Sequence, residues 1–207
     1  MKRIEVYLFY RLDALEQSPL VQLKNPAFSA ELWTPSLRAP WPHGASRDKK
    51  LHFLFRTLLR VTRMFPSNDS GALVLYEAAR LVHYSAFTPR YWRFPFLAGH
   101  DLQVGDTWTE PSYRGKGLAK RALQRLVTRM RMPGRNFWYV VEDINRASVK
   151  VAEDCGFRLA GIGTRVERLK GLDYYEIRAQ KPGGSQPPRR AAGGPVNVWS
   201  WDNVPPF

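Results

Sequence analysis

A short loop rich in glycine and positive charge is the part of this sequence best suited to chemistry. It consists of Arg114, Gly115, Lys116, Gly117, Leu118 and Ala119. The loop lies between a predicted strand and a predicted helix. The first N–H groups of a helix have no internal partner, and the helix dipole leaves partial positive charge there. Because glycines let a phosphate group approach these donors closely, we predict that the loop binds an anion.

Two side chains upstream of the loop are candidates for proton transfer. Asp106 lies in a strand predicted for residues 102–109, and His83 lies in a predicted hairpin. A carboxylate can accept a proton directly or through water, and imidazole titrates near neutral pH. Each also has a structural alternative. Asp106 would be a strand-end carboxylate bonded to backbone or to an arginine, and His83 would be a structural histidine within a strand.

The hydrophobic pattern predicts the elements that must position these residues. Strands are expected at residues 3–10, 28–33, 72–77, 81–88, 102–109, 136–142, 157–166 and 174–179. Helices are expected at residues 49–65, 117–130 and 146–155. A hairpin that feeds alternating helices and strands predicts an α/β (α+β) fold, with a mixed sheet and helices on its faces.

The helix predicted at residues 49–65 has one apolar side and one basic side. Its apolar residues are Leu51, Leu54, Phe55, Leu58, Val61 and Phe65. Its basic stripe consists of Lys49, Arg56, Arg60 and Arg63. This spacing predicts a surface helix whose apolar side packs on the core. The alternative is a helix that also touches an anionic acceptor or a membrane surface.

At the glycine loop the chain resembles the GNAT (Gcn5-related N-acetyltransferase) superfamily of acyltransferases. The cofactor loop of that superfamily reads Arg/Gln-x-x-Gly-x-Gly/Ala, and residues 114–119 match it. A second matching stretch follows downstream, where Asn145 to Ser148 precede Gly156 and Phe157. GNAT proteins often carry Asn-x-x-Ala/Ser and then Gly-Phe at this separation. Two motifs in the right order are more specific than either one alone.

The resemblance implies a mostly antiparallel mixed sheet that is splayed between its fourth and fifth strands, with coenzyme A in the opening. Backbone amides from Gly115 to Ala119 would hold the pyrophosphate, with Arg114 beside them. Main-chain groups of Trp108 and Thr109 would pair with the pantetheine like an added strand. Further along, the helix that begins after Asn145 would lie beside the same arm.

On this resemblance the chain is an enzyme of the acyltransferase class, with acetyl-CoA as the default co-substrate and no metal. Asn145 would bond the pantetheine arm through its side-chain amide, and Ser148 would lie near it. A plain helix N-cap is the alternative role of Asn145, and the two can coexist. One departure concerns the leaving thiolate. Ala152 stands where many family members have the tyrosine that protonates it, so another group or solvent must supply that proton.

Composition sets the outer bounds of these predictions. The chain has 207 residues, one cysteine and a formal net charge of +14. A single cysteine excludes a disulfide framework within one chain and favours a reducing compartment, and we expect ordinary packing for Cys155. No apolar run is long enough to span a bilayer, and no signal peptide is recognisable. We expect a cytoplasmic protein with an acyltransferase domain at residues 1–179 and a Pro/Gly-rich tail at 180–207.

The positive charge favours an anionic acceptor. The helix after the loop is the most basic segment, with Lys120, Arg121, Arg125, Arg129 and Arg131. One hypothesis is transfer to an amine of a nucleotide-linked or lipid-linked sugar that bears phosphate. A second is modification of a nucleic acid or of a protein bound to one. A third is a nucleic-acid-binding module that keeps the fold without turnover, which the missing tyrosine would permit.

Overall fold

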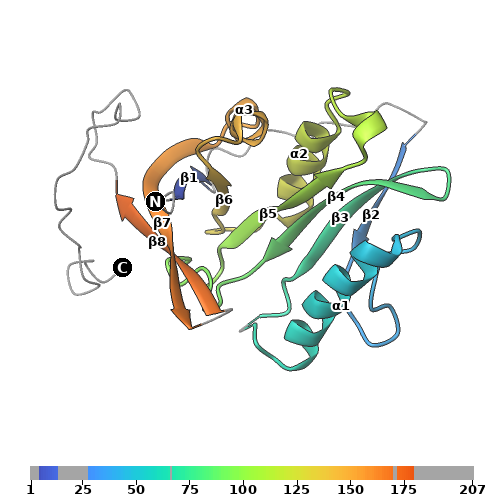
Figure 1. Cartoon of the computed structure of the whole chain (residues 1–207), viewed down its shortest axis with the longest axis horizontal. Helices are drawn as coiled ribbons and strands as arrows, with labels where there is room; N and C mark the ends of the chain where they lie inside the picture. The colour runs from blue at the N-terminus through green and yellow to red at the C-terminus, as the bar shows by residue number, and fades with distance from the viewer. Residues whose placement is uncertain (1–4, 14–27, 66, 170–171, 180–207) are drawn as a thin grey trace.

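The computed structural model describes residues 5–13, 28–65, 67–169 and 172–179. Its centre is one eight-stranded sheet with the order β2-β3-β4-β5-β6-β1-β7-β8 (Figure 1). The strands are β1 Val6–Leu12, β2 Phe28–Trp33, β3 Gly71–Glu77, β4 Arg80–Thr88, β5 Leu102–Thr109, β6 Phe137–Glu142, β7 Arg158–Leu169 and β8 Leu172–Ala179. The helices are α1 Arg47–Val61, α2 Leu118–Met130 and α3 Arg146–Asp154, with a 3-10 turn, η1, at Pro111–Tyr113.

The predicted fold class is confirmed. Each neighbouring pair of strands is antiparallel except β5 and β6, which are parallel. That pair is short, because its register runs only from Leu102 opposite Phe137 to Val104 opposite Tyr139. The splay therefore lies between the fifth and sixth strands of this chain. The resemblance placed the splay between the fourth and fifth strands. The number of each later strand is higher by one here, because β2 lies between β1 and α1 in the sequence.

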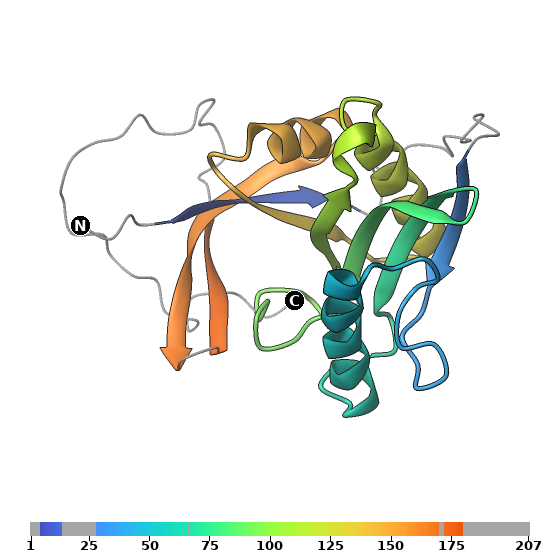
Figure 2. The same ribbon diagram turned by 45° about the vertical axis from the view of Figure 1, so that its right-hand side comes forward.

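The helices cover the two faces of the sheet (Figure 2). α2 and α3 pack on one face over the largest apolar cluster, which includes Leu123, Leu126 and Phe137. α1 lies on the other face, where Phe53 packs among Trp33, Tyr84 and other residues of the neighbouring strands. A third cluster fills the space between β1, β6 and the aromatic loop at residues 91–97.

α2 follows the amphipathic rule. Its buried residues are Leu118, Ala122, Leu123, Leu126 and Val127. They recur at three- and four-residue intervals and form one face of the helix. The predicted helix at residues 117–130 is thus confirmed with its apolar side on the core. Gly117 precedes the helix as its N-cap.

α1 does not follow this rule, and the prediction that its apolar side packs on the core is wrong. Its buried residues are Phe53 and Thr57. The exposed fractions are 72% for Leu51, 56% for Phe55 and 49% for Leu58. The stripe that should have been inside faces solvent, because the basic side has specific partners on the sheet.

Those partners are an aromatic ring, a carboxylate and backbone carbonyls. Lys49 Nζ lies 3.8 Å from the centre of the Trp108 ring. Arg60 Nη1 donates to the Ser70 carbonyl at 3.0 Å. Such cation–π contacts and charge-assisted hydrogen bonds hold the basic side of α1 against the sheet. The C-terminal tail predicted at residues 180–207 lies outside the described residues, and the division into domain and tail stays a prediction.

Candidate active site

The glycine loop forms an open approach to the first turn of α2. Gly115 has φ +76 and Gly117 has φ +73, backbone angles that glycine adopts at little cost. A Cβ atom placed on either residue would meet no atom within 4 Å. No side chain caps the first turn of α2, and there is no acidic residue in that turn. This arrangement fits a pyrophosphate group.

The charged side chains of the loop lie close to it. Arg114 Nε donates to the Thr109 carbonyl at 3.2 Å, and Lys116 Nζ lies 4.6 Å from the centre of the Tyr113 ring. Leu118 is buried and can offer an incoming phosphate only its backbone N–H, whereas Ala119 is half-buried. The loop thus combines backbone donors with two cations.

Beyond Val104 the two parallel strands part. β5 continues along β4, with Trp108 opposite Tyr84 and Thr109 opposite His83. β6 instead continues along β1 as far as Glu142. The edge of β5 from residue 105 to 109 that faces β6 has no register partner on that strand. Trp108 and Thr109, the residues predicted to pair with an extended ligand, lie on this edge.

Asn145 and Ser148 lie at the start of α3. Asn145 Oδ1 accepts a hydrogen bond from the Ser148 N–H at 3.1 Å, so Asn145 is the N-cap of α3. Because β5 and β6 are parallel, the helices that follow them begin at the same edge of the sheet. The structure therefore brings Asn145 and the glycine loop to the same end of the opening.

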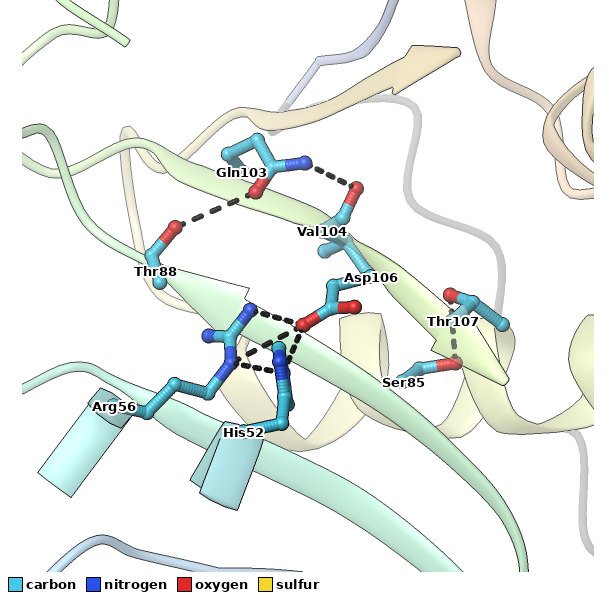
Figure 3. Close-up of polar contacts among 8 residues, drawn as sticks. All are labelled: His52, Arg56, Ser85, Thr88, Gln103, Val104, Asp106 and Thr107. Atoms are coloured by element: carbon cyan, nitrogen blue, oxygen red, sulfur yellow. Dashed lines mark hydrogen bonds and ion pairs between the residues drawn. The ribbon is translucent and has the colours of Figure 1, made fainter. Parts of the chain in front are cut away.

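Asp106 occupies a β-bulge in β5. Gly105 pairs with Ala86 and Thr107 pairs with Ser85, so Asp106 is an extra residue that β4 does not match. Its φ of +49 is unusual for a residue other than glycine. The bulge turns the Asp106 carboxylate toward α1 (Figure 3).

Two side chains of α1 meet this carboxylate. Arg56 Nη2 lies 2.8 Å from Asp106 Oδ2, and His52 Nε2 is in close contact with the same oxygen. Burial would raise the pKa of Asp106, but the hydrogen bond from His52 and the charge of Arg56 outweigh burial. They hold the pKa of Asp106 well below its usual range, so the carboxylate is ionised at neutral pH.

His52 was not among the residues predicted for the site. Its Nε2 lies close to Asp106 and 3.1 Å from Arg56 Nε. A single ring nitrogen cannot accept a hydrogen bond from Arg56 and at the same time donate one to Asp106. The close contact with the carboxylate requires the proton on Nε2, so in the neutral ring the lone pair is on Nδ1. The signal in the sequence was the four-residue spacing of His52 and Arg56, which places both on one side of a helix.

His83 lies elsewhere, inside the sheet. It is fully buried, with Nδ1 2.8 Å from Thr109 Oγ1 and Nε2 2.9 Å from Ser85 Oγ. Burial lowers the pKa of His83 to about 3, so the ring is neutral at physiological pH. Both of its nitrogens already have hydroxyl partners, which favours the structural alternative for this residue.

Tyr139 lies where the strands part and was also missed by the sequence analysis. It is 5% exposed and faces Thr107 of β5 and Ser148 of α3. Burial raises the pKa of Tyr139, although its hydrogen bonds with Ser148 and Thr107 act in the opposite direction. The phenol is therefore protonated at neutral pH. Ala152, at the position of the family's tyrosine, is fully buried on the side of α3 that packs on the core.

A cavity of about 370 Å³ opens beside the His52–Asp106 pair. Its wall includes Arg56 and Arg93 together with an apolar and aromatic part. The members of that part are Phe55, Leu59, Phe65, Tyr91, Phe94, Val140 and Tyr175. The cavity therefore joins α1, the aromatic loop and β8 at the side of the sheet opposite α2.

Other kinds of site were sought in the same part of the chain. Within residues 5–13, 28–65, 67–169 and 172–179, no cluster of side chains has the composition of a metal site. No helix in those ranges is long and apolar enough to cross a membrane. Cys155 is half-buried, and burial raises the pKa of its thiol to about 12, which suits packing better than nucleophilic attack. The cytoplasmic location stays a prediction.

Two solved structures with TM-scores above 0.5 support the fold. A tandem GNAT protein from the clavulanic acid biosynthesis pathway aligns with a TM-score of 0.51 and 16% identity, over 76% of this chain and 51% of that one. A Drosophila protein aligns with a TM-score of 0.52 and 11% identity, over 85% of this chain and 52% of that one. A GNAT acetyltransferase from Colwellia psychrerythraea gives 0.49 and 15%, over 76% and 53%.

This chain spans about half the length of each of these three structures. No protein of curated function matches it in sequence. Residues 28–157, from β2 to the start of β7, match the family model described as Acetyltransferase (GNAT) family. This stretch includes the glycine loop, the bulge and the parted strands. The chain therefore belongs to the GNAT acetyltransferase family.

Proposed function

We propose that this protein transfers an acyl group, acetyl by default, from acyl-CoA directly to an amine. The observation that carries the proposal is the geometry of the opening. A helix N-terminus framed by glycines lies at the same edge as the end of two parallel strands that part, and an ionised carboxylate lies beside the gap. Family membership supports an acyltransferase in general.

The glycine loop would hold the pyrophosphate of the co-substrate. Backbone N–H groups from Gly115 to Ala119 would donate to it, and Arg114 and Lys116 would add charge. The edge of β5 at Trp108 and Thr109, which has no register partner on β6, would pair with the pantetheine arm. On the opposite wall, Asn145 and Ser148 would contact that arm while Asn145 still caps α3.

His52 would accept the proton of the acceptor ammonium. Asp106, held ionised, would fix the ring orientation and stabilise the imidazolium that forms, as a carboxylate does beside a catalytic histidine. The freed amine attacks the thioester carbonyl, a C–N bond forms, and the C–S bond breaks. This assigns Asp106, a predicted catalytic residue, a positioning role, and we propose a structural role for His83.

Tyr139 would return a proton to the leaving thiolate in place of the absent tyrosine at position 152. Its phenol is protonated at neutral pH and lies between Thr107 and Ser148, on the two sides of the opening. The hydroxyl would donate its proton to sulfur and regain one from solvent. Tyr139→Phe should lower kcat while leaving acyl-CoA binding unchanged.

The acceptor amine would enter through the 370 Å³ cavity. Arg56 is committed to Asp106, whereas Arg93 pairs loosely with Asp173 at 3.7 Å and its side chain is 41% exposed. Arg93 is therefore the cation available to an anionic group on the acceptor, such as the phosphate of an amino sugar. If so, glucosamine 6-phosphate should be a better acceptor than glucosamine, and Arg93→Ala should remove the difference.

A second candidate function is nucleic-acid binding along α2. Arg121, Arg125 and Arg129 recur every four residues, and none has a carboxylate partner among the residues that the structure describes. A row of this kind suits a phosphate backbone, with or without turnover. Binding of duplex DNA that weakens steeply with salt and is lost in Arg121→Glu/Arg125→Glu would support this candidate.

Calorimetry with acetyl-CoA tests the main proposal. Gly117→Glu places a carboxylate in front of α2 and should abolish binding. Gly134 is a matched control, because it has φ +76 and equally open space around its Cβ position, but lies after the other end of α2. Gly134→Glu should bind like the unaltered protein. Absence of binding by the unaltered protein, or equal loss in both variants, would contradict the proposed site.

A further inference from the structure

The outer side of α1 is an apolar surface that the described chain leaves uncovered. Leu51, Phe55, Leu58 and Val61 are 72, 56, 49 and 44% exposed. Their spacing places them along one side of the helix, opposite the side that buries Phe53 and Thr57. Figure 2 shows α1 on the outside of the sheet. Scattered exposed apolar residues need no explanation, but a contiguous row marks a surface that binds something.

This surface is hollowed and continuous with the proposed acceptor cavity. A depression of about 490 Å³ is lined by Asp48, Leu51, His52, Leu54, Phe55 and Leu58. His52 and Phe55 also line the 370 Å³ cavity. An apolar path therefore starts at the proposed base, passes Phe55 and continues onto the outer side of α1.

We propose that the acceptor is an amphiphilic amine: besides any anionic group that meets Arg93, it has a linear hydrocarbon chain that leaves the cavity beside Phe55 and lies along the apolar row of α1. This inference rests on the proposed N-acyltransferase function. The amine would meet His52 at one end of the path, and the chain would cover the apolar row at the other. The polar groups are concentrated near His52, whereas four of the six residues of the depression are apolar.

A second copy of this protein fits the same surface less well. The first turn of α1 carries the exposed Arg47 and Lys50, and the exposed Arg63 follows its last turn. Pairing two such helices, parallel or antiparallel, would bring positive ends together around the apolar row, and Asp48 is the one acid in α1. Each chain also carries a net charge of +14. A hydrocarbon chain meets no such repulsion.

The test is a series of linear amines from propylamine to octylamine with acetyl-CoA. Burial of methylene groups should raise kcat/KM by about twofold for each added carbon, less than full burial would give because the depression is open. Leu51→Ser/Leu58→Ser should flatten the series, because the two serines no longer offer the longer chains an apolar contact. Leu37→Ser, at a 74% exposed leucine in the loop before α1, is the matched control and should keep the dependence.

Each other outcome has a definite meaning. Equal kcat/KM for propylamine and octylamine would overturn the inference while the acyltransferase function stands. If no amine is acylated, the proposed function fails, and octylamine binding measured by calorimetry decides the inference alone. Equal octylamine binding by the unaltered protein and Leu51→Ser/Leu58→Ser would overturn it. A dimer that dissociates in this variant, measured by light scattering, would assign the surface to a second copy and also overturn it.

Discussion

α1 and α2 are both amphipathic, yet they turn opposite sides toward the sheet. α2 buries its apolar residues and directs its arginines outward. α1 directs Lys49, Arg56 and Arg60 toward the sheet and leaves Leu51 and Phe55 in solvent. Hydrophobic periodicity therefore identifies the two sides of a helix, but it does not determine which side packs against the sheet. α2 serves as a core helix, whereas α1 supplies side chains to the proposed reaction.

The largest expected effect concerns the inward side of α1. His52→Ala should lower kcat by about 10²- to 10⁴-fold, as removal of a general base does. Stability should change little, because the His52 side chain is 37% exposed. His100→Ala, in an exposed loop, should retain activity. Steady-state kinetics with thermal unfolding would check both. An active His52→Ala would show that α1 only supports the sheet.

A leucine-to-alanine substitution should lower the free energy of unfolding much more in α2 than in α1. Leu126→Ala in α2 should cost about 2–5 kcal/mol of unfolding free energy, because Leu126 is fully buried. Leu58→Ala in α1 should cost about 0.5 kcal/mol or less, because half of Leu58 is exposed. Urea denaturation gives both values. Equal losses would mean that the outer side of α1 is covered in solution.

As the pH falls, protonation of His83 on the α2 side of the sheet should lower the stability of the protein before protonation of Asp106 on the α1 side does. The folded-state pKa of His83 is lowered to about 3, so the unfolded chain binds the extra proton and stability falls as pH drops below about 6.5. Between pH 7 and 5 the loss should be about 2 kcal/mol. The pKa of Asp106 is also lowered, and its contribution is lost only below about pH 4.

Urea denaturation at pH 7 and pH 5 would measure this sensitivity. His83→Asn should show a smaller fall than the unaltered protein, because it has no imidazole to protonate. Asp106→Asn should show the same fall as the unaltered protein over this interval. A fall that depends on Asp106 instead would place the acid-sensitive group on the α1 side.

The smallest expected effect concerns α3. Asn145→Ala should lower stability by about 1 kcal/mol through loss of the N-cap bond to Ser148. Asn145→Asp should restore the cap but not the amide donor that the proposed pantetheine contact needs. Acetyl-CoA calorimetry on the pair therefore separates the two roles. Normal binding by Asn145→Asp would leave Asn145 with capping alone.

Local sequence predicted the elements well. β5 was expected at residues 102–109 and forms there, and α2 begins one residue later than expected. Glycines, prolines and the hydrophobic periodicity indicate where elements begin and end, because each acts over only a few residues. The strand at residues 28–33 was found in the same way. The DNA-binding and acceptor alternatives stayed open, because charge alone does not choose a partner.

The partners of side chains across the sheet could not be predicted. Arg56 and Asp106 are 50 residues apart, and their contact depends on a bulge that no local pattern indicates. His52 and Tyr139 were missed for the same reason. Asp106 and His83 were chosen by residue type and strand position, which do not reveal whether a carboxylate is ion-paired or an imidazole is enclosed.

The bulge in β5 adds a carboxylate to the sheet without changing how β4 and β5 pair on either side of it. Gly105 and Thr107 face successive residues of β4, Ala86 and Ser85, as though nothing stood between them. Deleting codon 106 would therefore give a strand in which every other cross-strand neighbour is retained and the carboxylate is gone. A single inserted residue is therefore enough to add this carboxylate to a ladder that continues directly from Gly105 to Thr107.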